Sequence, residues 1–357
     1  MDLGRCHISS PRTIAVIPTL SEHTQRRLLR CALRPPALHC ASRRRHGPTQ
    51  AGRAVHIRAR VETVPIYATR YSDIKTTSAR AAARHVALSA LSAAYGLNGR
   101  VRDGLARPRV QVLYLHFVFE DQLDSFDALV GTLARYSQFV SYSEALDHIA
   151  SGESDAPCVT FTFDDGLANC RDAADILERH GARAAFFVCP GIVGEANADN
   201  VAAFCRRRLN MPPTEFMSWD DIEDLARRGH EIGNHTMDHA DLGAVSTQEA
   251  ADQIESASDA LRRKLGGVQH FAWPYGQWSN FTPDAEVAAA RAGLTCAAAV
   301  RGCHHPSSTP RGRVCVRRDH VVASWPMAHT LYFLARNALR PLARDDGWRD
   351  DWPEWQE

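Results

Sequence analysis

The chain has 357 residues and a formal net charge of +1, with 42 Lys and Arg against 41 Asp and Glu, so it can hold one large domain or two small ones. No apolar stretch is long enough to span a membrane. No apolar run of the right length follows the first basic residues, so we expect neither a transmembrane segment nor a signal peptide.

Arginine is unevenly spread and is concentrated in residues 1–60. A basic arm of this kind can bind nucleic acid or anionic lipid. Arginine is preferred along the whole chain, however, where the only lysines are Lys75 and Lys264, so the arm does not require such a partner. We therefore expect no nucleic-acid partner and a disordered basic extension over residues 1–75.

Strand and helix patterns alternate after this arm, which predicts a parallel sheet closed or nearly closed into a (β/α) barrel. A helical lead-in over 76–107 precedes a catalytic region at 108–340, and an acidic, Trp-containing tail follows over 341–357. The predicted strands are, in chain order, 110–117, 139–141, 158–163, 184–188, 231–234, 268–273 and 295–300, and a late strand carries Arg317 and Arg318. The predicted helices are 79–95, 125–136, 143–150, 167–180, 201–209, 219–228, 247–265, 283–292 and 326–339.

Ten cysteines show no Cys-x-x-Cys spacing. Several lie in apolar strand or helix contexts, as small buried thiols do. This pattern favours a reducing compartment, and we expect a cytoplasmic protein.

Two segments carry the chemistry. Asp164 and Asp165 end the predicted strand 158–163, and His235 and His239 follow the strand 231–234. Two histidines four apart share one face of a helical turn. One carboxylate and two imidazoles form a ligand set for a catalytic divalent metal, most often zinc, and leave the second carboxylate free as a base.

Each segment also has an ordinary structural interpretation. Asp-Asp-Gly after a strand is commonly a turn that caps a helix, and a His-x-x-x-His pair is commonly two surface histidines. Both segments, however, stand where a strand passes into a loop, and chemistry collects at that edge of α/β barrels. A third segment, His270–Gly276, ends in a Pro-Tyr-Gly turn that can aim a backbone N–H at a developing oxyanion.

These segments resemble the motifs of the polysaccharide deacetylases, the NodB homology domain of the family 4 carbohydrate esterases. Thr162–Gly166 is similar to the first motif, Gly229–His239 to the second and Phe271–Gly276 to the third, while Leu113–Val118 is similar to an opening strand of many members. The similarity covers about residues 108–320. It implies a deformed or incomplete (β/α) barrel of the polysaccharide deacetylase type.

The resemblance also implies roles for individual residues. Asp165, His235 and His239 would hold a divalent metal, with Zn²⁺ the commonest. Asp164 would be the general base, and the backbone N–H of Tyr275 would stabilise the oxyanion. Substrate-binding positions carried over from the family are His116, Trp273, Pro274 and Tyr275.

The sequence departs from the family at two places. Phe271 or Ala272 stands where many members have an arginine that pairs with the base. Arg317 or Arg318 can supply this charge from a later strand, and Arg318 is favoured because alternation puts it on the face of the apolar Val316. The late Leu-x-His motif, which offers a general acid, has no clean match, so His320 and His329 stay open as candidates.

The function implied is metal-dependent removal of N-acetyl or O-acetyl groups from an amino sugar in a polysaccharide or glycan precursor. Two alternatives remain: hydrolysis of a small cyclic amide or ureide on the same fold, and a non-catalytic glycan-binding relative. The N-acetylated carbohydrate is the expected partner. The sequence leaves open which glycan is used and whether the chain forms oligomers.

Overall fold

The computed structural model describes residues 67–74, 79–306 and 315–340. Most of the expected extension 1–75 and all of the tail 341–357 lie outside these residues. Residues 67–74 of the expected extension are folded onto the domain, because the N–H of Ala68 donates to the Pro213 carbonyl and that of Tyr71 donates to Asp121. No helix in the described segments is long and apolar enough to cross a membrane.

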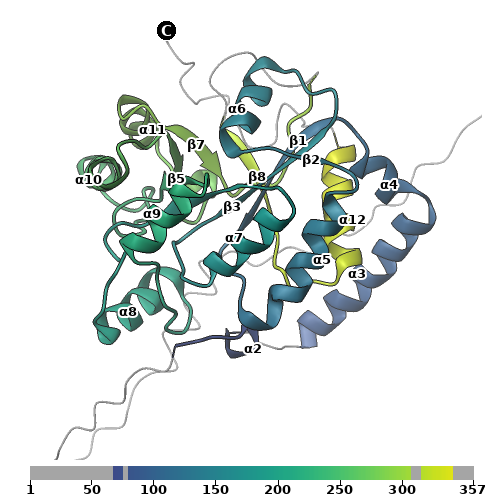
Figure 1. Ribbon diagram of the computed structural model, residues 1–357, viewed down its shortest axis with the longest axis horizontal. Coiled ribbons are helices and arrows are strands. Elements are labelled where there is room, and N and C mark those ends of the chain that lie inside the picture. The colour runs from purple at the N-terminus through teal and green to yellow at the C-terminus, as the bar shows by residue number, and fades with distance from the viewer. Residues whose placement is uncertain (1–66, 75–78, 307–314, 341–357) are drawn as a thin grey trace, which may run out of the picture. The chain divides into compact units, whose positions relative to one another are not determined.

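Seven parallel strands of the described chain close into a barrel (Figure 1), which confirms the predicted fold class. The ring closes at β1, which pairs with both β3 and β8. A short eighth strand, β2 (Gln138–Phe139), pairs with β3 outside the ring. The strands of the ring are β1 (Arg109–Leu115), β3 (Pro157–Phe163), β4 (Ala184–Val188), β5 (Glu231–Asn234), β6 (His270–Ala272), β7 (Thr295–Ala298) and β8 (Val316–His320).

Helices surround the barrel and agree closely with the predicted ranges. Serine and threonine caps begin several of them, as at α10, where the Ser246 side chain accepts from the Glu249 N–H. One helix starts later than predicted, because Leu167 pairs as a β-bridge with Phe216 instead of opening the helix. The helices are α2 (Tyr71–Ile74), α3 (Ala79–Leu97), α4 (Arg100–Leu105), α5 (Leu123–Leu133), α6 (Tyr142–Ser151), α7 (Cys170–Arg179), α8 (Ala198–Phe204), α9 (Trp219–Arg227), α10 (Thr247–Leu265), α11 (Pro283–Arg291) and α12 (Met327–Leu339), with short turns η1 (Glu120–Gln122), η2 (Cys205–Leu209) and η3 (Trp278–Asn280).

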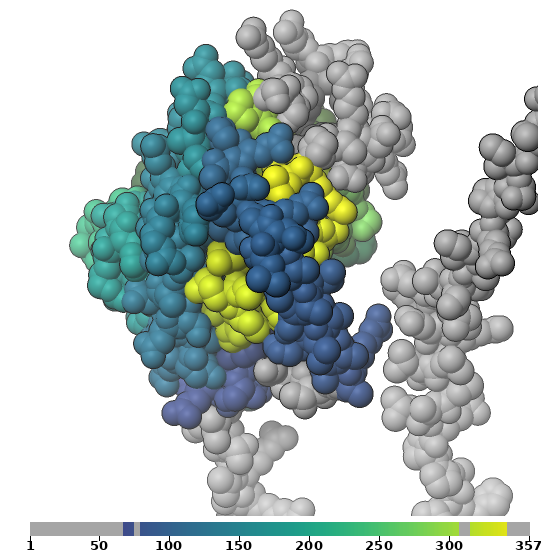
Figure 2. Space-filling view, turned by 90° about the vertical axis from the view of Figure 1, so that its right-hand side faces the viewer, coloured from purple at the N-terminus to yellow at the C-terminus, as the bar shows by residue number. Residues whose placement is uncertain are grey.

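The helices α3, α4 and α12 lie side by side on one face of the molecule (Figure 2). The rings of Tyr95 and Tyr332 meet edge to face at 4.8 Å between α3 and α12. These three helices therefore form a lateral layer outside the barrel.

The interior of the barrel is a separate apolar cluster. It consists of alternate residues of six strands, such as Val112, Phe187 and Val316, together with residues of α6. The α6 side chains Tyr142, Ala145 and Ile149 belong to this cluster, so α6 closes the amino-terminal end of the barrel. The carboxyl-terminal end is left for the loops that carry Asp164, Asp165 and the two histidines.

Candidate active site

The acidic pair follows β3 at the carboxyl edge of the barrel. The N–H of Asp164 donates to the Leu115 carbonyl at 3.0 Å, which continues the β1–β3 pairing by one residue. At Asp165 the backbone turns into the left-handed region, with φ 73°, and Gly166 follows with φ 78°. Adjacent side chains of a strand point to opposite faces, and this turn separates the two carboxylates further. Each carboxylate therefore has a different partner.

The two histidines lie in the loop after β5, not on a helical turn, so the prediction of a shared helix face is wrong. Thr236 and His239 both have positive φ, 64° and 53°. The turn is held locally, because the N–H of Thr236 donates to the Asn234 side chain and the N–H of Ala240 donates to the Thr236 hydroxyl. These contacts bring the two rings together, with centroids 5.1 Å apart.

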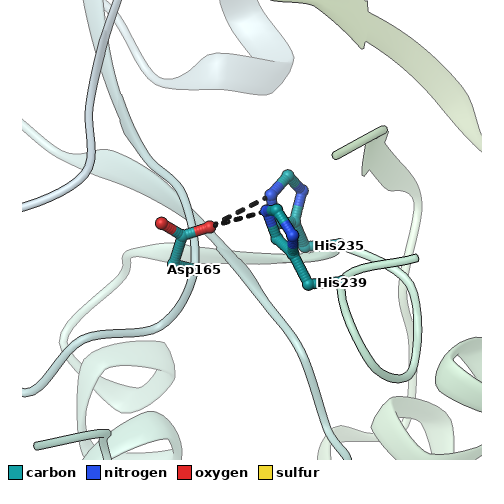
Figure 3. Close-up of side chains that lie close together, drawn as sticks. All are labelled: Asp165, His235 and His239. Carbon is teal, nitrogen blue, oxygen red and sulfur yellow. Dashed lines mark ion pairs between the residues drawn. The ribbon is translucent and has the colours of Figure 1, made fainter. Parts of the chain in front are cut away.

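Asp165, His235 and His239 converge as the family resemblance implies (Figure 3). Asp165 Oδ1 lies 3.4 Å from His235 Nε2 and 3.2 Å from His239 Nε2, and all three side chains are buried. Among the described residues, no group donates a hydrogen bond to Asp165 Oδ1, although this atom is buried. His235 Nδ1 lies 2.6 Å from the Ala272 carbonyl, which requires the proton on Nδ1 and leaves Nε2 as a lone pair facing Asp165.

This donor set fits a divalent cation. Two imidazole nitrogens and one carboxylate oxygen form the open three-ligand set of catalytic zinc sites. The unsatisfied Asp165 Oδ1 is the kind of buried polar atom that a bound ion satisfies. Zinc and other divalent metals that accept nitrogen and oxygen ligands are compatible with it.

Asp164 is held by Arg318 of β8. The guanidinium donates two parallel hydrogen bonds to the carboxylate, Nη1 to Oδ1 at 2.7 Å and Nη2 to Oδ2 at 2.9 Å. Arg318 is 0% exposed and also donates to the Thr162 hydroxyl and the Ala298 carbonyl. Its charged plane lies 5.0 Å from the ring of Tyr114, within the range of a cation–π contact.

The neighbouring Arg317 is turned to the outside of the barrel. It is buried as well, so neither arginine is a solvated residue at a strand end. Its backbone N–H donates to His304 and its side chain donates to the Arg301 carbonyl. The two arginines therefore have different partners, and of the two only Arg318 contacts Asp164.

The charges around Asp164 keep it ionised. Burial acts to raise the pKa of this carboxyl, but the Arg318 guanidinium, through its charge and its two hydrogen bonds, outweighs burial and holds the pKa below its usual value. Burial likewise acts to lower the pKa of Arg318, and Asp164 outweighs it and raises the pKa. Asp164 is thus a carboxylate at neutral pH and can accept a proton.

Tyr275, with φ 62°, lies beside the triad of Asp165, His235 and His239. Its ring meets that of His239 edge to face at 4.9 Å, and 46% of the residue is exposed. Among the described residues, no acceptor takes a hydrogen bond from the Tyr275 backbone N–H. A free backbone donor next to a metal site suits an oxyanion, as the Pro-Tyr-Gly turn predicts.

Trp273 and Pro274 do not offer a surface to a sugar. Both are buried, and Trp273, 1% exposed, is stacked on Phe281 at 4.4 Å with its Nε1–H donating to the Gln277 carbonyl. The prediction that Trp273 and Pro274 bind substrate directly is therefore corrected: they support the turn that presents Tyr275. Sequence alone could not distinguish the two, because an aromatic ring packs equally well on a sugar or on Phe281.

The two candidates for the general acid, His320 and His329, lie in different parts of the structure. His329 of α12 is hydrogen-bonded at 3.0 Å to Ser89 of α3, in the lateral helix layer. His320 ends β8 and lies 5.5 Å, ring to ring, from His116, which follows β1. Burial lowers the pKa of His320 to about 3, so this imidazole is neutral at pH 7. His116, predicted to bind substrate, thus shares the rim of the site with Asp164 and His320.

Comparison with known proteins identifies the family. A family model described as polysaccharide deacetylase matches residues 151–297. A chitooligosaccharide deacetylase of Sinorhizobium fredii is 31% identical over 173 residues, which are 47% of this chain and 67% of that protein. The chain belongs to the polysaccharide deacetylase family.

Two further similarities are more limited. A peptidoglycan-N-acetylglucosamine deacetylase of Bacillus cereus is 31% identical over 140 residues, 38% of this chain and 43% of that protein. The structure of the Streptococcus pyogenes deacetylase PplD in complex with acetate has a TM-score of 0.52 at 18% identity, over 64% of this chain and 99% of that one. At this identity the structural match supports the barrel fold alone.

Proposed function

We propose that this protein is a metal-dependent hydrolase that removes N-acetyl groups from an amino sugar in a polysaccharide or glycan precursor. The observation that carries the proposal is the convergence of Asp165, His235 and His239 beside an ionised carboxylate, Asp164. A divalent cation bound there lowers the pKa of water and polarises the acetyl carbonyl. Relatives named as deacetylases support the choice of an acetylated sugar.

The side chains of the chain itself divide the remaining work. Asp164 accepts the proton of the attacking water through a lone pair that Arg318 leaves free, since an ionised carboxylate offers about four acceptor sites. Arg318 fixes the orientation of Asp164 and keeps it charged. The backbone N–H of Tyr275 donates to the oxyanion that forms as the carbonyl is attacked.

The leaving amine needs a proton donor, and His116 is our choice. It stands at the carboxyl end of β1, next to the strand that carries Asp164, and is only partly buried. His320 is a weaker candidate because burial keeps its imidazole neutral. We propose that His320 acts through its ring contact with His116, which limits the orientations of the donor.

An acetate-release assay tests the function. The purified chain is incubated with N-acetylated and O-acetylated oligosaccharides and with small cyclic amides, each with and without a chelator. We expect acetate from N-acetylated sugars only, lost with the chelator and restored by added Zn²⁺. Hydrolysis of the cyclic amides alone would favour the alternative amidohydrolase, and a metal-loaded protein that hydrolyses nothing would favour a glycan-binding relative.

A further inference from the structure

The loop between β4 and α9 carries a helical insert at the carboxyl edge of the barrel. Its central part is α8 followed directly by η2, a π-helical turn over Cys205–Leu209. In Figure 1, α8 lies at the lower left, beyond the strands of the barrel. Single π-helical turns are rare in proteins overall, and those that occur are often found at functional sites. The side chains that this turn presents therefore need an explanation.

The insert is joined to both loops that carry metal ligands. Its return segment binds the acidic loop, where the N–H of Met217 donates to the Gly166 carbonyl at 2.9 Å. Its start binds the histidine loop, where the N–H of Gly191 donates to the Met237 carbonyl at 2.9 Å. The approach is so close that a Cβ at Gly191 would lie 2.7 Å from that same carbonyl oxygen. The insert therefore has a fixed position relative to Asp165 and His239.

The insert is also packed internally. Asn197 caps α8 by accepting from the N–H groups of Asp199 and Asn200. Phe204 and Phe216 meet edge to face at 5.4 Å, and Cys205 is buried. An element that is capped and packed against the main core of the domain presents its surface side chains in a defined place.

Tyr275 links the π-helical turn to the active site. Its hydroxyl donates to the Arg208 carbonyl at 3.1 Å, while its ring rests against that of the metal ligand His239. A single residue, Tyr275, thus connects the turn to the triad. The turn therefore borders the rim of the site on the side of His239.

Three consecutive arginines, Arg206, Arg207 and Arg208, stand on the turn. Arg206 and Arg207 are exposed and Arg208 is partly buried. None of them forms an ion pair with an acidic side chain in the part of the chain that the structure describes. Arg207 Nε donates only to the Ala203 carbonyl of its own helix. Guanidinium groups without an acidic partner among the described residues match carboxylates and phosphates in charge and in hydrogen-bond geometry.

We infer that the substrate of this site is an acidic glycan, with a carboxylate or phosphate group near the acetylated amino sugar, and that Arg208 and its two neighbours bind this group. The inference rests on the proposed deacetylase function. It predicts a preference for an acidic oligosaccharide over a neutral one of equal length. The preference falls as salt is added, because the arginines lie at the solvent-exposed rim.

Steady-state acetate release from three oligosaccharides of equal length tests the inference. One is a neutral N-acetylglucosamine oligomer, the second alternates N-acetylglucosamine with a uronic acid, and the third carries a phosphate on the neighbouring sugar. We expect kcat/KM for at least one acidic substrate to exceed that for the neutral one by about tenfold, through KM. The acidic substrate that gains identifies the source of the anionic group.

The variant Arg208→Gln keeps the backbone carbonyl that Tyr275 binds, and Arg206→Gln/Arg207→Gln removes the other two charges. Each should reduce kcat/KM for the preferred acidic substrate several-fold more than for the neutral one. Arg263→Gln is the matched control: Arg263 is an exposed arginine in the basic last turn of α10, outside the insert and the loops of the candidate site, and its loss should change neither value.

Two outcomes distinguish a failure of this inference from a failure of the proposed deacetylase function on which it rests. Turnover of no acetylated sugar at all would overturn the proposed function. Equal turnover of the neutral and acidic substrates, or equal losses in the Arg208→Gln and Arg263→Gln proteins, would overturn the acidic-glycan inference and leave the deacetylase standing.

Discussion

Carboxylates meet histidines at both ends of this barrel, with opposite results. At the amino end, Glu231 accepts hydrogen bonds from the backbone and hydroxyl of Ser143 in α6, at 3.0 and 2.6 Å, and its Oε2 lies 2.8 Å from His270 Nε2. Both oxygens of Glu231 are satisfied. At the carboxyl end, Asp165 Oδ1 faces two imidazole nitrogens and accepts no hydrogen bond from the part of the chain that the structure describes.

The difference shows that residue types alone do not make a site. The Glu231 cluster uses its polar groups to attach the closing helix to β5 and β6, as a structural network does. The Asp165 cluster keeps an unsatisfied atom at the cost of desolvation, which is expected where a ligand completes the network. Backbone conformation follows the same division. Four of the five non-glycine residues with positive φ in the described chain lie in the loops that form the candidate site: Asp165, Thr236, His239 and Tyr275. The fifth, Asn210, ends the π-helical turn of the insert at the same edge of the barrel.

The largest effect should come from removing a metal ligand. In His235→Ala the site loses one of three ligands, so the bound divalent metal, about one per chain in the wild type, should be mostly lost. Deacetylase activity should fall by about 10³-fold or more, since the rate enhancement of such sites depends on the ion. Metal analysis and acetate release measure both. Full metal occupancy in His235→Ala would show that His235 is not a metal ligand, and the contrast between the Asp165 cluster and the Glu231 cluster would then fail.

The next effect separates base from ligand. Asp164→Asn preserves size but removes the proton acceptor, so kcat should fall about 10²-fold or more while metal is retained. The change also leaves the buried Arg318 charge without its partner, and a fall in thermal stability is expected. Loss of metal in this variant would instead reverse the roles of Asp164 and Asp165.

A comparison of the two adjacent arginines sharpens the assignment of Arg318. Arg318→Ala should lower kcat strongly with metal retained and destabilise the fold by about 3–5 kcal/mol, because it leaves a buried carboxylate uncompensated. Arg317→Ala should have the milder effect on kcat, since the Arg317 side chain contacts the Arg301 carbonyl and the Trp278 ring rather than Asp164.

Urea unfolding and single-substrate kinetics measure these quantities. In the double variant Asp164→Asn/Arg318→Met both charges are absent, so part of the lost stability should return without activity. Equal kinetic losses in the Arg317→Ala and Arg318→Ala proteins would refute the special role of Arg318.

The smallest effect on activity is expected at the amino end. Burial acts to raise the pKa of Glu231, but His270 and Ser143 outweigh it and lower the pKa. A carboxyl with a lowered folded-state pKa stabilises the fold above its unfolded pKa of about 4.3, and this contribution is lost as the pH falls through the folded-state value.

The variant Glu231→Gln should therefore lower the melting temperature at pH 7 and lose less stability than the wild type on acidification below about pH 4. Its kcat should stay within about twofold of the wild type. A large loss of metal or of kcat in Glu231→Gln would mean that the two ends are coupled and that the comparison fails.

The sequence predicted the parts of this site that depend on local pattern. The positions after two strands drew attention to the acidic pair and the two histidines, the family resemblance implied Asp165, His235 and His239 as ligands, and strand alternation favoured Arg318 as the inward-facing arginine. The structure brings these three side chains together and pairs Arg318 with Asp164. The positive φ values of Asp165 and His239 were not predictable, since these residues also occur in ordinary turns. Nor was the burial of Trp273, which depends on Phe281 and thus on how the third motif packs against η3.

Closure of the ring at β1 has a consequence for how the enzyme is made. The base lies after β3 and its guanidinium partner on β8, and these two strands are the neighbours of β1. The segment matched by the family model ends at residue 297, before Arg318 is reached. A chain emerging from the ribosome therefore contains all three metal ligands well before it can neutralise Asp164 or complete the barrel. The pair of Asp164 and Arg318 that accepts the proton is complete only when β8, the last strand, has been made. A prematurely terminated chain ending near residue 300 should therefore be unable to transfer this proton even if it retains Asp165, His235 and His239.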